Sequence, residues 1–507
     1  MPPAKPRLRP ATVIAAGIGA ALLLLLAVTT VAPHPTVAGG IGLVVVGICL
    51  VALYRATIES FAPVAVTFWA FVVVWVGFAP LLQIRDNVLP WRDTPLYQHY
   101  VTAQVILLLA TLSFFAGYYL KLGFRGRAAG ARPHAGYPTD GPASRPAPRW
   151  RRLATRLEVT VEKAVVLTGV AAILAAICLP ITGGLTVRFA TRDALKEAIR
   201  EAGLVKGNDQ ALVGLLGILP AATSMVALVL CLLCWRDRRW ADRRARRILV
   251  AATVVAVGLN VIYNNPLSAN RFTAFSVILA AMFALIRFDT LRWRAGFTTA
   301  MLLGLAVVYP LANLFRNERS RANLRLGLDA YYTNDFDGFQ QTVNSVFYVE
   351  VHGHTWGHHL ISALLFWVPR SIWEGKAIGA GNVVAASRGY TFQNLSLPFW
   401  AEVFLEFSLV GVVVLLFFYG RMARFLDQAL RDTRAGLLPL LTILFAACQI
   451  GLLRGPLGAQ IPFAGAAFGV AVISVVAWRG RRWRLTTTAH ADHDAPLPRR
   501  TVQTGTR

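Results

Sequence analysis

Long apolar runs separated by short polar segments dominate the pattern of hydrophobic and polar positions along this 507-residue chain. A run of roughly 17 to 25 apolar residues crosses the hydrocarbon core of a bilayer as a helix. Twelve such runs occur, at 11–32, 37–54, 61–82, 100–121, 161–183, 211–235, 248–264, 272–287, 295–315, 401–420, 436–453 and 460–478. The pattern therefore predicts an all-α, polytopic membrane protein with about 12 transmembrane helices.

The composition agrees with this interpretation. Hydrophobic residues make up 56% of the chain and charged residues 15%, and the mean hydropathy is +0.54. These values exclude an ordinary soluble or disordered chain. The first run follows basic residues as a signal peptide does, but the next residues, Pro33 to Thr36, offer no Ala-x-Ala cleavage site. We expect this run to be retained as the first transmembrane helix.

The net charge of the chain is +26, and its basic residues gather in the segments between the predicted spans. Threading the runs from a cytoplasmic N-terminus places the basic segments 121–160, 236–247 and 479–484 inside the cell. This is the distribution that the positive-inside rule requires. We therefore expect a multi-pass protein of the bacterial cytoplasmic membrane with both termini cytoplasmic, surrounded by membrane lipids and without a nucleic-acid partner.

The runs and the segments between them divide the chain into six parts. These are 1–121 with transmembrane helices one to four, 122–157 as a flexible basic cytoplasmic linker, 158–315 with helices five to nine, 316–400 as a large extracytoplasmic catalytic loop, 401–484 with helices ten to twelve, and 485–507 as a disordered cytoplasmic tail. Gly, Pro, Ala and Arg without helical periodicity indicate the linker. Within the large loop, short helices are expected near 336–351 and 360–368.

Arginines on the predicted outer side depart from the positive-inside rule, so each needs a partner there. Arg271 opens the eighth run, and Arg316 and Arg319 follow the ninth on one helix face. A guanidinium binds phosphate through two parallel hydrogen bonds and keeps its charge at every relevant pH. Together with Arg370 and Lys376 these arginines are expected to bind a pyrophosphate. Anchoring to lipid headgroups is the alternative.

Candidate acids and bases gather in and beside the same loop. Histidines stand at positions 352, 354, 358 and 359, and Glu402 lies at the mouth of the tenth run. Imidazole titrates near neutral pH, which suits a proton acceptor. Glu402, His354 and His358 are therefore the candidate catalytic residues, with Glu402 favoured as the base, and a structural helix-entry or salt-bridge role is the alternative for Glu402. No His-Glu-x-x-His spacing occurs there, so no metal is expected.

Several motifs in this region resemble a known family. They are Asn265-Pro266 with Arg271, Gly353-x-Thr355-x-Gly357, Val368-Pro369-Arg370-Ser371-Ile372-Trp373-x-x-Lys376, and Ala401-Glu402 leading to Gly411. The chain resembles the Wzy-type oligosaccharide repeat-unit polymerases of the O-antigen polymerase superfamily over about residues 255 to 420. Glu374 and Ala377 stand where the family pattern has prolines after the Trp and the Lys.

The resemblance implies a polymerase that joins undecaprenyl-pyrophosphate-linked oligosaccharides at the outer face of the cytoplasmic membrane. The lipid-linked oligosaccharide would be both donor and acceptor, Trp356 and Trp373 would bind its glycan, and a chain-length regulator and a flippase would be further partners. No cofactor is expected, because the polyprenyl pyrophosphate bond supplies the energy. A ligase-like or other polyprenyl-dependent glycosyltransferase and a lipid-linked sugar transporter remain the alternatives.

Overall fold

Helices make up 81% of the residues that the structure describes, and no strand occurs among them. The computed structural model describes residues 37–91, 96–120, 157–190, 195, 210–237, 243–311, 327–432 and 436–476. Its longer helical elements are α2 (Val37–Glu59), α3 (Pro63–Val72), η1 (Val73–Phe78), α4 (Ala79–Asp86), α5 (Tyr100–Tyr119), α7 (Val161–Ile181), α10 (Gln210–Arg236), α11 (Arg243–Tyr263), α12 (Arg271–Leu285), α13 (Leu291–Leu303), α19 (Phe399–Asp432), α20 (Leu437–Arg454) and α21 (Leu457–Val476). The all-α fold class predicted from the sequence is confirmed.

Ten helical segments among the described residues are long and apolar enough to span a membrane. They coincide with ten of the twelve predicted runs, and the protein is a multi-pass membrane protein. The run predicted at 272–287 corresponds to the shorter apolar helix Arg271–Leu285, and the run at 11–32 lies outside the described residues. The total of twelve therefore stays a prediction. The predicted linker and the predicted tail lie almost wholly outside the described residues as well.

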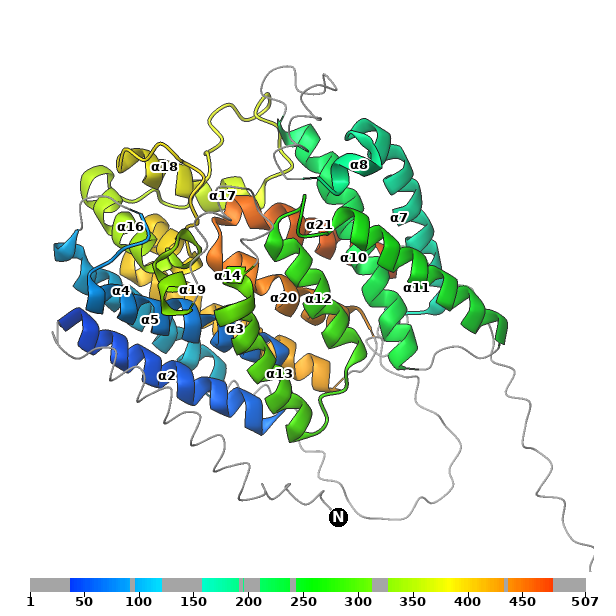
Figure 1. The fold of residues 1–507 in the computed structure, drawn as a ribbon, viewed down its shortest axis with the longest axis horizontal. Coiled ribbons are helices and arrows are strands. Elements are labelled where there is room, and N and C mark those ends of the chain that lie inside the picture. Colours follow the sequence, from blue (N-terminus) through cyan, green and yellow to red (C-terminus); the bar gives the residue numbers. More distant parts are fainter. Residues whose placement is uncertain are drawn as a thin grey trace, which may run out of the picture.

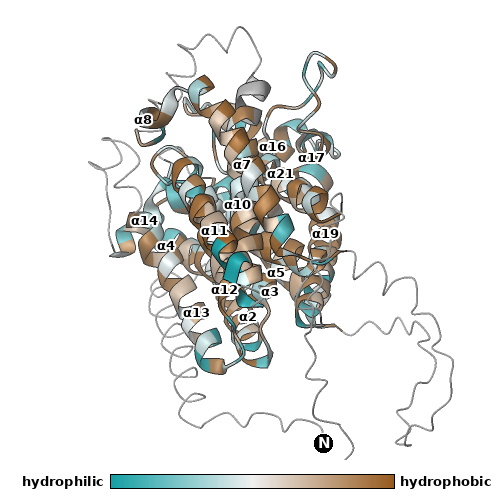
Figure 2. Ribbon diagram, turned by 90° about the vertical axis from the view of Figure 1, so that its right-hand side faces the viewer, coloured by the Kyte–Doolittle hydropathy of each residue, from teal (hydrophilic) through white to brown (hydrophobic). Residues whose placement is uncertain are grey.

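Two glycines bring α5 and α19 into contact backbone to backbone. A Cβ atom added to Gly117 would overlap the carbonyl oxygen of Phe417, and one added to Gly420 would overlap that of Phe114. Small residues permit such approach between membrane helices. Beside this pair α3 forms the centre of the bundle, with all ten of its residues buried. In Figure 2 the long helices are mostly brown, the colour of hydrophobic residues, as expected for spans that face lipid or one another.

Short helices form a layer over one end of the bundle. They are α16 (Gly338–His352), α17 (His358–Leu364) and α18 (Ala380–Ser387), drawn along the upper part of Figure 1. The first two correspond to the helices expected near 336–351 and 360–368. Trp91, which follows α4, donates from Nε1 to Asp337 at 3.0 Å, and His99, before α5, lies 3.2 Å from Glu350. The layer is thus fastened to the ends of α4 and α5.

Candidate functional site

A break in α19 lies beneath this layer. Phe407 (φ −135°, ψ 17°) and Ser408 (φ 63°, ψ −168°) leave the helical conformation, so α19 consists of two helices joined at these residues. The φ and ψ of Ser408 fall in a region that only glycine occupies without strain. The side chain of Phe407 packs directly against the backbone of Gly411, because a Cβ atom added to Gly411 would overlap it. Backbone strain of this kind persists only where the surrounding structure enforces it, and it concentrates at functional sites.

The backbone groups beside the break bind a turn that carries histidines. We call residues 353–359 the histidine turn. Thr355 donates its backbone N–H to the carbonyl of Leu405 at 3.2 Å, and Trp356 donates to that of Glu406 at 3.1 Å. Positive φ values at Gly353, Trp356 and Gly357 shape the turn. Carbonyls at a helix end need partners inside a membrane protein, so the histidine turn and the broken end of α19 stabilise each other.

Glu406 and His359 form a buried pair at this contact. Oε1 of Glu406 lies 3.0 Å from Nδ1 of His359 and accepts the backbone N–H of His359 at 3.1 Å. The side chains are only 1% and 7% exposed. Oε2 of Glu406 is buried and has no hydrogen-bond partner among the described residues. A buried carboxylate with an unused oxygen is costly, and the same carboxylate fixes the tautomer and orientation of the imidazole.

His354 and His358 lie toward the surface. Nδ1 of His354 is 3.3 Å from the carbonyl oxygen of Leu405, and Nε2 of His358 is 2.8 Å from that of Gly375. A carbonyl oxygen only accepts hydrogen bonds, so each of these ring nitrogens carries a proton. In the neutral imidazole the basic nitrogen is then Nε2 in His354 and Nδ1 in His358. Both histidines therefore have a defined proton-accepting atom.

The two tryptophans expected to bind glycan lie beside these histidines. The ring of Trp356, 73% exposed, is 5.8 Å from that of His354. Trp373 is 6.3 Å from His358 in ring-centroid distance. An exposed indole beside a proton acceptor offers a surface on which a sugar ring can stack. The structure thus brings together both histidines and both tryptophans of the predicted site.

Arg370 and Lys376 close the loop that contains them. Nζ of Lys376 donates to the carbonyls of Leu365, Phe366 and Val368 at 2.9 to 3.0 Å, which satisfies the end of α17. Burial, and after it the charge of Arg370, lowers the pKa of Lys376. Arg370 donates to the carbonyls of Lys376 and Ala377 at 2.6 and 3.0 Å and is exposed. Lys376 therefore has a structural role, while Arg370 presents a charge to solvent.

Arg271 lies in a separate network. Its Nη2 donates to Asp335 at 2.8 Å, and its guanidinium lies 4.8 Å from the ring centre of Tyr309. Arg454 joins the network by donating to the carbonyl of Asp335 and lies 3.9 Å from Asp337. Burial raises the pKa of Asp337, and the charge of Arg454 opposes this. Arg316 and Arg319 lie outside the described residues, so the predicted set of five cations is described only in part.

Glu402 joins two helices. Its Oε2 accepts the backbone N–H of Leu457, the first residue of α21, at 2.8 Å, and the residue is 1% exposed. A carboxylate in this position accepts from an N-terminal N–H of α21 and is stabilised by the positive end of the helix dipole. The observed contact is structural and lies at the N-terminus of α21, not at the entry of α19 itself. A catalytic role for Glu402 stays a prediction.

Sequence reasoning does not single out Glu406, Asp335 or Arg454. A signal exists for Glu406, because an acid inside an apolar run is a functional candidate by default and Glu406 follows Glu402 by one helical turn. Among the described residues, no group of three or more His, Cys, Asp or Glu side chains is arranged to hold a metal ion. The chain matches no protein-family model, no curated protein and no solved structure. The fold defines the class: an all-α, multi-pass membrane protein.

Proposed function

We propose that this protein is a polysaccharide polymerase that joins undecaprenyl-pyrophosphate-linked oligosaccharide repeat units at the outer face of the bacterial cytoplasmic membrane. The observation that carries the proposal is the docking of the histidine turn on the broken end of α19. This contact holds proton acceptors and an exposed indole together at one end of a membrane bundle. The resemblance of the motifs to those of the oligosaccharide repeat-unit polymerases supports the same reaction.

In the proposed reaction a hydroxyl group of the acceptor sugar attacks the anomeric carbon of the donor. A glycosidic C–O bond forms while the C–O bond to pyrophosphate breaks, and undecaprenyl pyrophosphate leaves with the bonding electron pair. The hydroxyl proton passes to a general base. Of the candidates Glu402, His354 and His358, the geometry favours Nε2 of His354, because His354 is half-buried beside an exposed indole whereas Glu402 is enclosed between helices.

Charge on the departing pyrophosphate needs fixed cations. Arg271, Arg316, Arg319, Arg370 and Lys376 remain the proposed set. Arg370 is the strongest of the described members, because its guanidinium is exposed next to the loop that carries Trp373. Arg271 would have to share its bond to Asp335 with the substrate, and Lys376 would have to leave three carbonyls.

The ligase and transporter alternatives predict different chemistry or different charges. A ligase would use the same base and cations, so geometry does not separate it. A transporter would be expected to hold ionisable groups along a path through its spans. Of the buried ionisable groups, Lys163, Glu402 and Asp427 bind backbone groups at helix ends, and Glu406 lies beside the break in α19. This arrangement favours the glycosyltransferase class.

Lipid-linked oligosaccharides extracted from a strain that lacks the gene separate the three functions. A polymerase defect leaves single lipid-linked repeat units that an externally added glycosidase can reach. A ligase defect leaves long lipid-linked polymer instead. A transport defect leaves single units protected inside the cell until the membrane is opened. Either of the last two results would overturn the polymerase proposal.

A further inference from the structure

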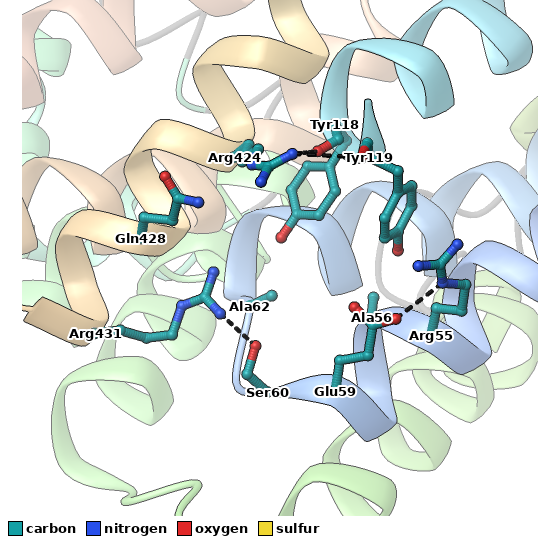
Figure 3. Close-up of a pocket in the computed structure, with 10 residues that line it drawn as sticks. All are labelled: Arg55, Ala56, Glu59, Ser60, Ala62, Tyr118, Tyr119, Arg424, Gln428 and Arg431. Carbon is teal, nitrogen blue, oxygen red and sulfur yellow. Dashed lines mark hydrogen bonds and ion pairs between the residues drawn. The ribbon is translucent and has the colours of Figure 1, made fainter. Parts of the chain in front are cut away.

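A cationic pocket lies at the end of the bundle opposite the histidine turn. Arg424 follows Leu409, the first residue after the break in α19, by 15 positions, a rise of about 22 Å at 1.5 Å per residue. The pocket has a volume of about 180 Å³ and is shown in Figure 3. It is lined by Arg55, Ala56, Glu59, Ser60, Ala62, Tyr118, Tyr119, Arg424, Gln428 and Arg431. The ends of three membrane helices, α2, α5 and α19, thus meet around one polar space.

The charge of the pocket is positive. Three guanidiniums line it together with one carboxylate, that of Glu59, which lies 2.9 Å from Arg55. Both partners of this pair are about half exposed, so the pair is weak and rearranges at little cost. The buried carboxylate of Asp427 behind the pocket is already satisfied, because it accepts the N–H groups of Val64 and Ala65 and the hydroxyl of Tyr118. The pocket therefore favours an anion.

Two arginines are held in place for such a ligand. Arg424 donates from Nη1 to the carbonyl of Tyr118 at 3.0 Å. Arg431 donates from Nη1 to the hydroxyl of Ser60 at 2.5 Å and from Nε to the carbonyl of Asp427 at 3.1 Å. A guanidinium carries five N–H donors, and these contacts use only Nη1 of Arg424 and Nε and Nη1 of Arg431. Figure 3 shows both side chains on the same face of α19 as Gln428.

An apolar groove borders the same two helices close to this pocket. Its volume is about 420 Å³, and it is lined by Leu109, Leu112, Ser113, Ala116, Val413, Val414, Phe417 and Phe418. One helical turn of α5 separates Ala116 from Tyr119, and two turns of α19 separate Phe417 from Arg424. Between them Arg421 donates to the carbonyl of Leu120 at 3.1 Å. An apolar groove that ends at fixed cations is chemically complementary to a lipid that carries an acyl chain and an anionic headgroup.

We propose that the groove and the cationic pocket together bind one anionic phospholipid. Its acyl chain lies between α5 and α19, and its phosphate binds Arg424 and Arg431. Basic pockets between membrane helices bind anionic headgroups in this way, and the predicted topology places this end in the cytoplasmic leaflet. The inference does not depend on the proposed polymerase activity, because it concerns the other end of the bundle and is tested by binding alone.

Native mass spectrometry of the purified full-length protein tests the proposal, with phosphatidylglycerol and phosphatidylcholine of identical acyl chains as probes. The wild-type protein should retain phosphatidylglycerol preferentially. The double variant Arg424→Gln, Arg431→Gln should bind it on the order of 30-fold more weakly. The matched control Arg244→Gln, Arg292→Gln changes two exposed arginines away from the pocket and should keep the preference. Equal binding of both lipids by the wild-type protein would overturn the proposal.

Two further variants keep the test decisive. Gln428→Glu adds a negative charge at an exposed pocket position and should weaken phosphatidylglycerol binding without lowering the thermal stability, even if the double arginine variant fails to fold. Ala116→Phe fills the apolar groove and should also weaken lipid binding. If inorganic phosphate displaces the lipid while Ala116→Phe binds it normally, the site takes free phosphate and the lipid assignment is wrong.

Discussion

Glu406 and His359 are joined by two contacts, one between Oε1 and the imidazole Nδ1 at 3.0 Å and one between Oε1 and the backbone N–H of His359 at 3.1 Å. The residues are separated by 47 positions in the chain, so the contact ties the histidine turn to the first half of α19. Replacement of either partner leaves the other buried and unpaired, which is costly. The pair is therefore the most direct place to test the proposed site.

Glu406→Gln should lower polymer formation by about 10- to 100-fold, the range seen when a partner that orients a functional histidine is replaced. Polymer in a complemented deletion strain is measured at matched protein level. Glu350→Gln is the control, because Glu350 also lies beside a histidine, His99, at 3.2 Å but is 65% exposed. The control should stay within about twofold of the wild type, as expected for an exposed pair. Normal polymer from Glu406→Gln would remove the pair from the proposed site.

The identity of the acceptor base is tested by comparing His354→Ala with Glu402→Gln on supplied lipid-linked repeat units. We expect His354→Ala to lose about 10²- to 10⁴-fold in turnover, the usual contribution of a general base, while its thermal stability is unchanged. Glu402→Gln should lose about 1 kcal/mol of stability with its contact to the N-terminus of α21, and turnover per folded molecule should persist. The reverse pattern would assign the base to Glu402.

Ser408→Gly should stabilise the protein. Ser408 has a φ of 63° and a ψ of −168°, a conformation that glycine adopts without the strain of about 1 to 3 kcal/mol imposed on other residues. The control is Ser474→Gly within α21, where glycine costs about 1 kcal/mol relative to alanine in a regular helix. Thermal unfolding in detergent should therefore shift in opposite directions for the two variants. Destabilisation by Ser408→Gly would show that the serine side chain itself is required there.

The spans are predictable from the sequence because length and hydropathy alone define them. The runs at 161–183 and 436–453 correspond closely to Val161–Ile181 and Leu437–Arg454. The prediction for 401–420 ends too early, because α19 continues to Asp432 through the cationic segment that follows Tyr419. An apolar run ends where the chain reaches the membrane surface, whereas a helix continues as long as its backbone hydrogen bonds and its packing allow.

The site is less predictable, because its key contacts are tertiary. Local composition places the histidines and tryptophans in one loop, and the structure keeps them together. Nothing in the local sequence indicates that Lys376 satisfies the carboxyl end of α17, that Glu402 binds Leu457, or that His359 meets Glu406. Each of these contacts depends on how separate helices pack. The sequence alone does not distinguish a charged side chain that binds a ligand from one that binds a backbone group.

Close packing of α5 on α19 predicts opposite effects for two Gly→Ala variants. Gly420→Ala places a methyl group on the carbonyl oxygen of Phe114, and overpacking of this kind costs about 1 to 3 kcal/mol or more. Gly169→Ala in α7 meets nothing within 4 Å and should gain up to about 1 kcal/mol from helix propensity. Yield of folded protein and thermal unfolding give the comparison. Equal behaviour of the two variants would contradict the packing of α5 on α19.

The orientation of the protein in the membrane is tested by single cysteines introduced at Ser387 and Ser144. Ser387 ends α18 in the layer that also contains the histidine turn, and Ser144 lies in the predicted cytoplasmic linker. We expect a membrane-impermeant thiol reagent to label Ser387→Cys in intact cells and Ser144→Cys only after the membrane is opened, because the positive-inside rule places the basic linker in the cytoplasm. The five native cysteines are buried, so the background should be low, and the cysteine-replaced parent chain controls for it. Labelling of Ser144→Cys alone in intact cells would show that the orientation is the reverse of the predicted one. The histidine turn would then lie on the cytoplasmic side, which would rule out polymer assembly at the outer face.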